Sequence, residues 1–135
     1  MPLTQLLYCS KAVAEITPED TESILDKSRI NNAANHITGF LCNNEQYFIQ
    51  LLEGNYRELN DTYNRIVADP RHEKITLLIY QSVEQRLFPN WSMGYIGDTQ
   101  YINDLLRKHV DAAGLLEPEL FGRACMRYMK TMSDS

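Results

Sequence analysis

Apolar residues along this chain occur in two patterns, short unbroken runs and helical repeats, which alternate over the first two thirds. Short apolar runs bounded by polar or turn-forming residues predict strands. Such runs occupy residues 3–9, 37–42, 46–53, 75–80 and 91–96. Two segments between them, 17–32 and 56–68, have features of helices. The predicted order is therefore strand, helix, strand, strand, helix, strand, strand.

The two helices are predicted from a start signal and from apolar spacing. Thr17 followed by Pro18 marks a helix start, because threonine caps a helix and proline suits its first position. In the second segment Leu59, Tyr63 and Ile66 repeat at the spacing of an amphipathic helix. Helices that alternate with strand pairs predict an α+β fold with a ferredoxin-like βαββαββ sheet. In that topology the first and third strands are central neighbours.

The last third of the chain has helical repeats only. They cover residues 101–113 and 119–132, with Gly114 and Pro118 between them. We predict a sheet domain at residues 1–97 and a two-helix extension at residues 98–135. Because the two helices add apolar faces, a homo-oligomer is expected.

Charge and cysteine content narrow the classes of function. The 135 residues carry a formal net charge of −5, which argues against nucleic-acid binding and against docking on an anionic membrane. Cys9, Cys42 and Cys125 are scattered, which is typical of reduced thiols. No cationic leader precedes the first apolar run, and no run approaches the roughly 20 apolar residues of a membrane span. A cytoplasmic protein is expected.

The common catalytic motifs are missing from the sequence. It has no glycine-rich phosphate loop, no H-E-x-x-H and no G-x-S-x-G. His36, His72 and His109 stand apart from other ligands at metal spacing, so no metal site is predicted. On these grounds the chain is not expected to be an enzyme.

Uncharged polar residues instead fall on a helical face that is expected to be buried. Ile24, Ser28, Asn31 and Asn32 share this face of the first helix. Buried amides without partners cost roughly 1–3 kcal/mol each. A planar heterocycle with donors and acceptors would supply partners, while a plain helix end is the alternative reading of two adjacent asparagines.

A second polar pair comes from the strands. Period-two alternation places Gln50 on the face of Phe48 and Leu52. Tyr8 lies on the first strand, the predicted neighbour of the strand that carries Gln50. Each residue alone is compatible with ordinary packing, but adjacent strands would bring this phenol and amide within hydrogen-bonding reach.

Cations follow the second helix. Arg65, Arg71 and His72 lie in its last turn or just beyond it. Such residues either complement the helix dipole or hold the phosphates of a nucleotide.

The last predicted strand carries an aromatic and methionine stripe. Alternation places Trp91, Met93 and Tyr95 on one face. This stripe is either core or a relay toward the appended helices.

Taken together, these residues resemble the BLUF domains, blue-light sensors that use FAD. The resemblance spans residues 2–97 and consists of several motifs in the same order. They are Leu6-Leu7-Tyr8-Cys9-Ser10, residues 31–39, residues 48–54, Asp69-Pro70-Arg71-His72 and Trp91-Ser92-Met93.

The resemblance implies roles for individual residues. Tyr8 would be the electron donor to the excited flavin, and Gln50 the switch between this phenol and the flavin ring. Trp91 and Met93 would also belong to the switch, and either of them could be the neighbour of Gln50. The residues implied to bind FAD are Ile24, Ser28, Asn31, Asn32, Phe48, Gln50, Arg65, Ile66, Asp69, Arg71 and His72.

Three functions are therefore distinguished. The first is a blue-light photoreceptor in which Tyr8 photoreduces a non-covalently bound flavin, Gln50 rearranges its hydrogen bonds and the C-terminal helices signal to a protein partner. The second is a flavin-dependent redox enzyme on the same fold, although the sequence has no nicotinamide motif. The third is a cofactor-free interaction module.

Overall fold

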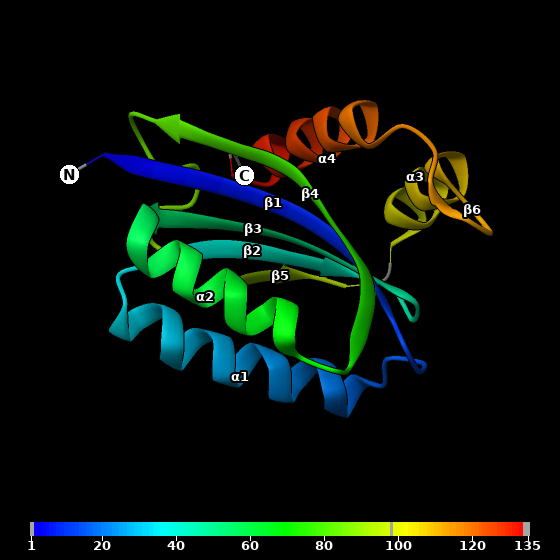
Figure 1. Ribbon diagram of the computed structural model, residues 1–135, viewed down its shortest axis with the longest axis horizontal. Coiled ribbons are helices and arrows are strands. Elements are labelled where there is room, and N and C mark those ends of the chain that lie inside the picture. Colours follow the sequence, from blue (N-terminus) through cyan, green and yellow to red (C-terminus); the bar gives the residue numbers. More distant parts are fainter. Residues whose placement is uncertain (1, 98, 134–135) are drawn as a thin grey trace.

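The computed structural model describes residues 2–97 and 99–133, which form a five-stranded sheet with helices on both faces (Figure 1). The elements in chain order are β1 (Leu3–Ala12), α1 (Pro18–Ala34), β2 (Thr38–Asn43), β3 (Tyr47–Asn55), α2 (Tyr56–Ala68), β4 (His72–Val83), β5 (Gly94–Ile96), α3 (Gln100–His109), β6 (Val110–Asp111), β7 (Gly114–Leu115) and α4 (Pro118–Ser133). The strand order is β4-β1-β3-β2-β5. The predicted α+β, ferredoxin-like fold is confirmed.

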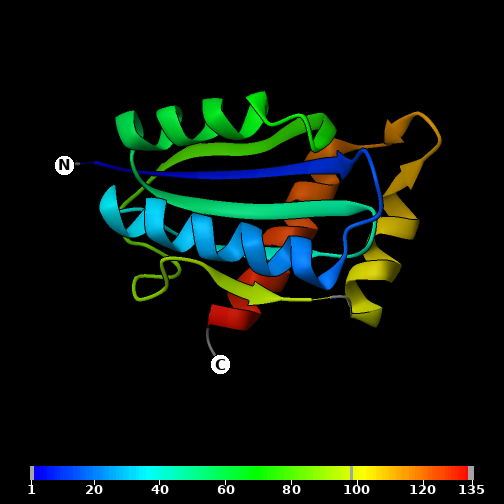
Figure 2. The same cartoon turned by 90° about the horizontal axis from the view of Figure 1, so that it is seen from below.

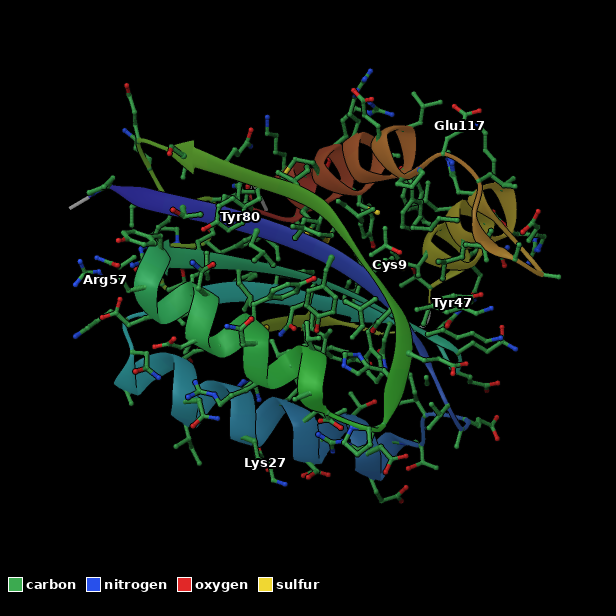
Figure 3. The ribbon with its side chains drawn as sticks, in the orientation of Figure 1. Cys9, Lys27, Tyr47, Arg57, Tyr80 and Glu117 are labelled. Carbon is green, nitrogen blue, oxygen red and sulfur yellow. The ribbon has the colours of Figure 1, made fainter. Side chains whose placement is uncertain are left out.

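Helices α1 and α2 cover one face of the sheet, and α4 crosses the other face (Figures 1 and 2). Two apolar clusters match these layers. Leu6 and Tyr8 of β1 belong to the cluster under α1 and α2, whereas Leu7 and Cys9 belong to the cluster under α4. Cys9 is seen between the sheet and the C-terminal helices in Figure 3. This alternation along β1 follows from the period of two in a strand.

The register of the central strands is fixed by antiparallel pairing. β1 pairs with β3 and with β4, and Tyr8 lies opposite Gln50. The prediction that the first and third strands are neighbours is therefore confirmed. The short β5 pairs in parallel with β2, from Phe40 opposite Gly94 to Cys42 opposite Ile96.

Helices α1 and α2 begin as their sequences predict. The Thr17 side chain accepts a hydrogen bond from the backbone of Asp20, and the Asp20 carboxylate accepts one from the backbone of Thr17, which is a capping box. α1 continues past the predicted end at residue 32 to Ala34. α2 has the predicted bounds, and Asn55 caps it by accepting from the backbone N–H of Arg57.

One strand begins later than predicted. Residues 91–93 are not in a strand, and β5 begins at Gly94. Trp91, Met93 and Tyr95 therefore do not share one face, and that prediction is wrong. Period-two alternation holds only where the backbone is paired in a ladder, and the pairing of β5 with β2 starts at Gly94.

The C-terminal segment contains the two predicted helices, with different bounds. α3 ends at His109, and residues 110–115 form a small hairpin in which Gly114 has a φ of 120°. A left-handed residue at that turn suits glycine. Phe121, Cys125 and Met129 form the buried stripe of α4. Because this stripe shares one cluster with the sheet, the boundary near residue 97 stays a prediction.

Candidate functional site

Tyr8 of β1 and Gln50 of β3 are joined by a hydrogen bond between their side chains. The Tyr8 hydroxyl donates to Gln50 Oε1 at 2.5 Å, and both residues are 4% exposed. Gln50 Nε2 lies 3.7 Å from Met93 Sδ and donates to it. The amide therefore has its oxygen toward the phenol and its nitrogen toward the thioether.

The environment of Tyr8 keeps its phenol neutral. Burial raises the pKa of Tyr8 far above its usual value, and the neighbouring Tyr63, Cys9 and Asp69 raise it further. A neutral phenol keeps its proton and can donate it, and in this structure Gln50 Oε1 accepts it.

A cavity of about 220 Å³ opens beside this pair, between α1, α2 and the sheet. Every residue implied to bind the cofactor lines it, although their roles stay predictions. The full lining is Tyr8, Ile24, Lys27, Ser28, Asn31, Asn32, Leu41, Phe48, Gln50, Leu52, Thr62, Arg65, Ile66, Asp69, Arg71 and His72. Two parts of the chain that are distant in sequence, α1 and the end of α2, therefore contribute to one cavity.

The two asparagines of α1 differ in burial. Asn32 is 2% exposed, and its Nδ2 donates to the backbone oxygen of Ser92 at 2.7 Å. Asn31 is exposed and lies at the rim of the cavity. Because α1 continues to Ala34, neither asparagine ends the helix. The Asn32 amide retains a second N–H and an oxygen for a ligand.

Asp69 and Arg71 form an ion pair at the other end of the cavity. Arg71 Nη2 lies 2.6 Å from Asp69 Oδ2, and Arg71 Nε is 3.0 Å from both oxygens. Hydrogen bonding to Arg71 lowers the pKa of the Asp69 carboxyl. The Arg71 side chain is 53% exposed, so it has open surface toward solvent and ligand.

His72 is held by the protein through both ring nitrogens. Nε2 lies 2.6 Å from the backbone oxygen of Ile66, and Nδ1 lies 2.7 Å from Ser10 Oγ. Since a carbonyl only accepts, Nε2 carries a proton and donates to it. Both ring nitrogens thus have partners within the protein, and the role of His72 toward a phosphate stays a prediction.

Trp91 and Met93 point in different directions. Met93 is 3% exposed and belongs to the cluster of Tyr8, whereas Trp91 is 43% exposed. The Trp91 ring stacks on Phe88 and Phe40, with centroids 5.4 and 5.8 Å apart. Met93 is thus the neighbour of Gln50, and Trp91 is not.

Two residues that contact predicted site residues, Tyr63 and Ser10, were not themselves predicted to belong to the site. Tyr63 of α2 lies with its ring centroid 5.7 Å from that of Tyr8, and Ser10 bonds His72. Both had a signal: Tyr63 belongs to the predicted apolar face of α2, and Ser10 shares a strand face with Tyr8 by alternation.

The cavity fits a planar heterocycle better than a metal ion. Within residues 2–97 and 99–133 no group of three or more His, Cys, Asp or Glu side chains is placed to hold a metal. Ile24 and Ile66 supply apolar walls from two helices, while Asn32 and Gln50 supply amides with donors and acceptors. These residues fit the ring system of a flavin.

No helix in the described part of the chain has both the length and the apolar character needed to span a membrane.

The comparisons with known proteins agree on one family. The family model described as sensors of blue light using FAD matches residues 3–94. The photoactivated adenylate cyclase subunit beta of Euglena gracilis is 33% identical over 92 residues, which are 67% of this chain and 11% of that protein. The chain thus spans about a tenth of the length of this curated relative.

Solved structures extend the likeness to the C-terminal helices. BlrB, a BLUF protein in its dark state, superposes with a TM-score of 0.79 at 26% identity, over 98% of this chain and 96% of that one. A bacterial light-regulated adenylyl cyclase gives a TM-score of 0.73 at 32% identity, over 78% of this chain and 33% of the cyclase. From its family match and its fold, this chain belongs to the BLUF family of blue-light sensors, whose cofactor is FAD.

Proposed function

We propose that this chain is a blue-light photoreceptor in which Tyr8 and Gln50 form the light-driven switch. The observation that carries the proposal is the bond from the Tyr8 hydroxyl to Gln50 Oε1, at the wall of a cavity that fits a flavin. Switching of this pair needs no substrate and leaves no product, so the chain acts as a sensor and not as an enzyme.

The bound flavin supplies the absorption of blue light and the capacity to accept an electron. Tyr8 is the donor, because it is a buried neutral phenol at the cavity wall. Loss of an electron makes a phenol strongly acidic, so its proton passes along the existing hydrogen bond to Gln50 Oε1, and it returns to Tyr8 when Tyr8 regains the electron. Gln50 therefore receives the first structural consequence of light.

Gln50 responds by exchanging the roles of its amide atoms. An amide has an acceptor oxygen and a donor nitrogen on one planar group. Rotation or tautomerisation therefore exchanges the donor and the acceptor that the neighbouring side chains contact. In the starting arrangement Nε2 donates to Met93 Sδ. The exchange breaks that contact and changes the position of Met93 without moving the β3 backbone.

The energy available for signalling is modest. One hydrogen bond contributes about 0.5–1.5 kcal/mol net, and about 1.4 kcal/mol shifts a two-state population tenfold. Light is therefore expected to bias an equilibrium between two arrangements of the output surface.

The C-terminal helices are the proposed output. Leu7, Ile49 and Leu51 alternate with the switch residues on β1 and β3, and they pack in the cluster of α4. A shift of Met93, which precedes β5, thus reaches that cluster through Ile96 of β5, which packs against it. We propose that α3 and α4 pass this bias to a protein partner or to a second copy of the chain.

The test is an absorption spectrum of the purified, FAD-loaded protein before and after blue light. A reversible red shift is expected in the wild type, and Tyr8→Phe or Gln50→Leu should abolish it. Tyr80→Phe is the matched control, because Tyr80 is 47% exposed and donates only to Asn60 of α2. A flavin-loaded wild type whose spectrum ignores light would overturn the proposal, and steady oxidation of NADPH would favour the redox enzyme.

A further inference from the structure

Three consecutive backbone carbonyls, those of residues 91, 92 and 93, each accept a hydrogen bond from a different group. The oxygen of Trp91 accepts from the backbone N–H of Gly39 at 3.0 Å. The oxygen of Ser92 accepts from Asn32 Nδ2 at 2.7 Å, and that of Met93 from Arg29 Nε at 3.1 Å. Because this segment precedes β5 and has no strand ladder, these contacts orient its backbone.

The orientation of the segment decides which side chain meets Gln50. With the carbonyls held as they are, Met93 points inward to Gln50 and Trp91 lies outside, against Phe88. The Trp91 ring also covers Gly94, where a Cβ would approach it to 2.3 Å. The two side chains are therefore placed on opposite sides by one backbone conformation.

Arg29 is the donor in this set whose side chain lies outside the candidate cavity. Asn32 also lines that cavity, and Gly39 belongs to β2, which pairs with β3, so a substitution of either residue would disturb more than this segment. Arg29 and Asn32 are three residues apart on α1, which places them on adjacent parts of one helical face. Two successive carbonyls are thus held by one helix.

The contact from Arg29 to the Met93 carbonyl is suited to hold this backbone in place. A charged donor forms a stronger hydrogen bond to a carbonyl than a neutral one does. Arg29 is exposed, so its loss leaves no buried charge and removes no core side chain. Its function in the fold is therefore separable from the stability of the core.

We infer that Arg29 is a positioning residue that holds Met93 against Gln50 by binding the Met93 carbonyl. The inference deepens the proposed function, since it matters for signalling only if Gln50 is the switch. The contact itself exists in the protein without light, so it is testable without photochemistry.

The experiment measures how fast hydrogen peroxide oxidises Met93 in the full chain, in the dark, with and without FAD, by peptide mass spectrometry. Met126 and Met129, which belong to the buried face of α4 and are 8% and 1% exposed, are the internal references. In Arg29→Ala, Met93 should be oxidised about 2- to 10-fold faster, the range that corresponds to loss of one hydrogen bond. The references should keep their rates.

Arg107→Ala is the matched control, because its guanidinium is 72% exposed and pairs with Asp104 on α3. It should leave the Met93 rate unchanged. Emission of the single tryptophan, Trp91, gives a second readout, and its quenching by acrylamide should change in Arg29→Ala only.

An unchanged Met93 rate in Arg29→Ala would overturn the inference. Equal acceleration at all three methionines would also overturn it, because Arg29 would then stabilise the whole fold. If Met93 alone responds while the wild type shows no light-induced shift, the clamp stands and the proposed photoreceptor fails.

Discussion

Gln50 Nε2 lies 3.7 Å from Met93 Sδ, so the Gln50 amide has a thioether as the acceptor of its nitrogen. Thioether sulfur is a weak acceptor, and this bond is easily exchanged for a better one. The amide is consequently held firmly at Oε1, by Tyr8, and loosely at Nε2. This asymmetry supports the rearrangement that we propose for Gln50, because only the weaker hydrogen bond has to break.

Met93→Leu should slow recovery from the light state. Leucine has a similar volume but no acceptor, so Nε2 of Gln50 loses its partner in the dark arrangement. Loss of one hydrogen bond lowers the advantage of that arrangement by about 0.5–1.5 kcal/mol, which corresponds to about 2- to 10-fold. The measurement is the decay of the red-shifted absorption after illumination. Met126→Leu, on the far side of the sheet, is the control, and equal kinetics in both variants would contradict the assignment.

Asn32→Ala should weaken FAD binding far more than Asn31→Ala. Asn32 is buried, lines the cavity and bonds Ser92, so its removal also leaves that carbonyl without its donor. The expected cost is about 1–3 kcal/mol, or roughly 5- to 150-fold in Kd. Asn31 is exposed and should change Kd by less than about threefold. Titration of the cofactor-free protein with FAD, followed by flavin fluorescence, measures both, and equal losses would refute the distinction.

Glu53→Gln should destabilise the fold. The Glu53 carboxylate is 0% exposed and accepts from the backbone N–H groups of Leu87 and Phe88 and from Gln5 Nε2. A glutamine at this position would turn an N–H group toward other donors, and the expected loss is about 2–4 kcal/mol. Urea unfolding measures it.

Glu119→Gln is the matched control for that substitution. Glu119 pairs with Arg123 on α4, but its side chain is 81% exposed. Exposed pairs contribute about 0–1 kcal/mol. Comparable losses in the two variants would show that the buried carboxylate has no special role.

The sheet and the contact between Tyr8 and Gln50 could be predicted from the sequence, for reasons that particular residues show. Tyr8 and Gln50 sit in apolar runs whose period of two fixes their face, and the strand order places them on neighbours. Thr17 and Pro18 predict the start of α1 from local chemistry alone. Such signals can be read from the sequence because they depend only on the backbone geometry within one element.

The conformation of residues 91–93 was not accessible in the same way. It depends on Asn32 and Arg29, which are about 60 residues away in the chain, and on Gly39. No period in the sequence encodes such contacts. Likewise the hairpin at residues 110–115 has only two paired positions, too few to show an alternation.

Stability should fall with alkaline pH, through the buried thiols on the α4 side of the sheet. Burial raises the pKa of Cys9 and of Cys42 from 9.0 to about 12. Between those values the unfolded chain releases protons that the folded chain keeps, so the free energy of unfolding falls as pH rises from about 9 to 12. Below that window both states are protonated and the two thiols contribute no pH dependence. Each thiol adds a slope of up to about 1.4 kcal/mol per pH unit.

Cys42→Ala separates this effect from the ionisation of other groups. It removes one of the three buried thiols, Cys9, Cys42 and Cys125, so the slope of unfolding free energy against pH should decrease by about 1 kcal/mol per unit between pH 9.5 and 11. The measurement is urea unfolding under reducing conditions, followed by Trp91 emission, at several values of pH. Because alanine leaves a small gap, the absolute stability at pH 7 will also be lower, and only the slope is diagnostic. An unchanged slope would mean that the Cys42 thiol ionises in the folded protein as readily as in the unfolded chain. Burial between the sheet and α4 would then not disfavour the thiolate.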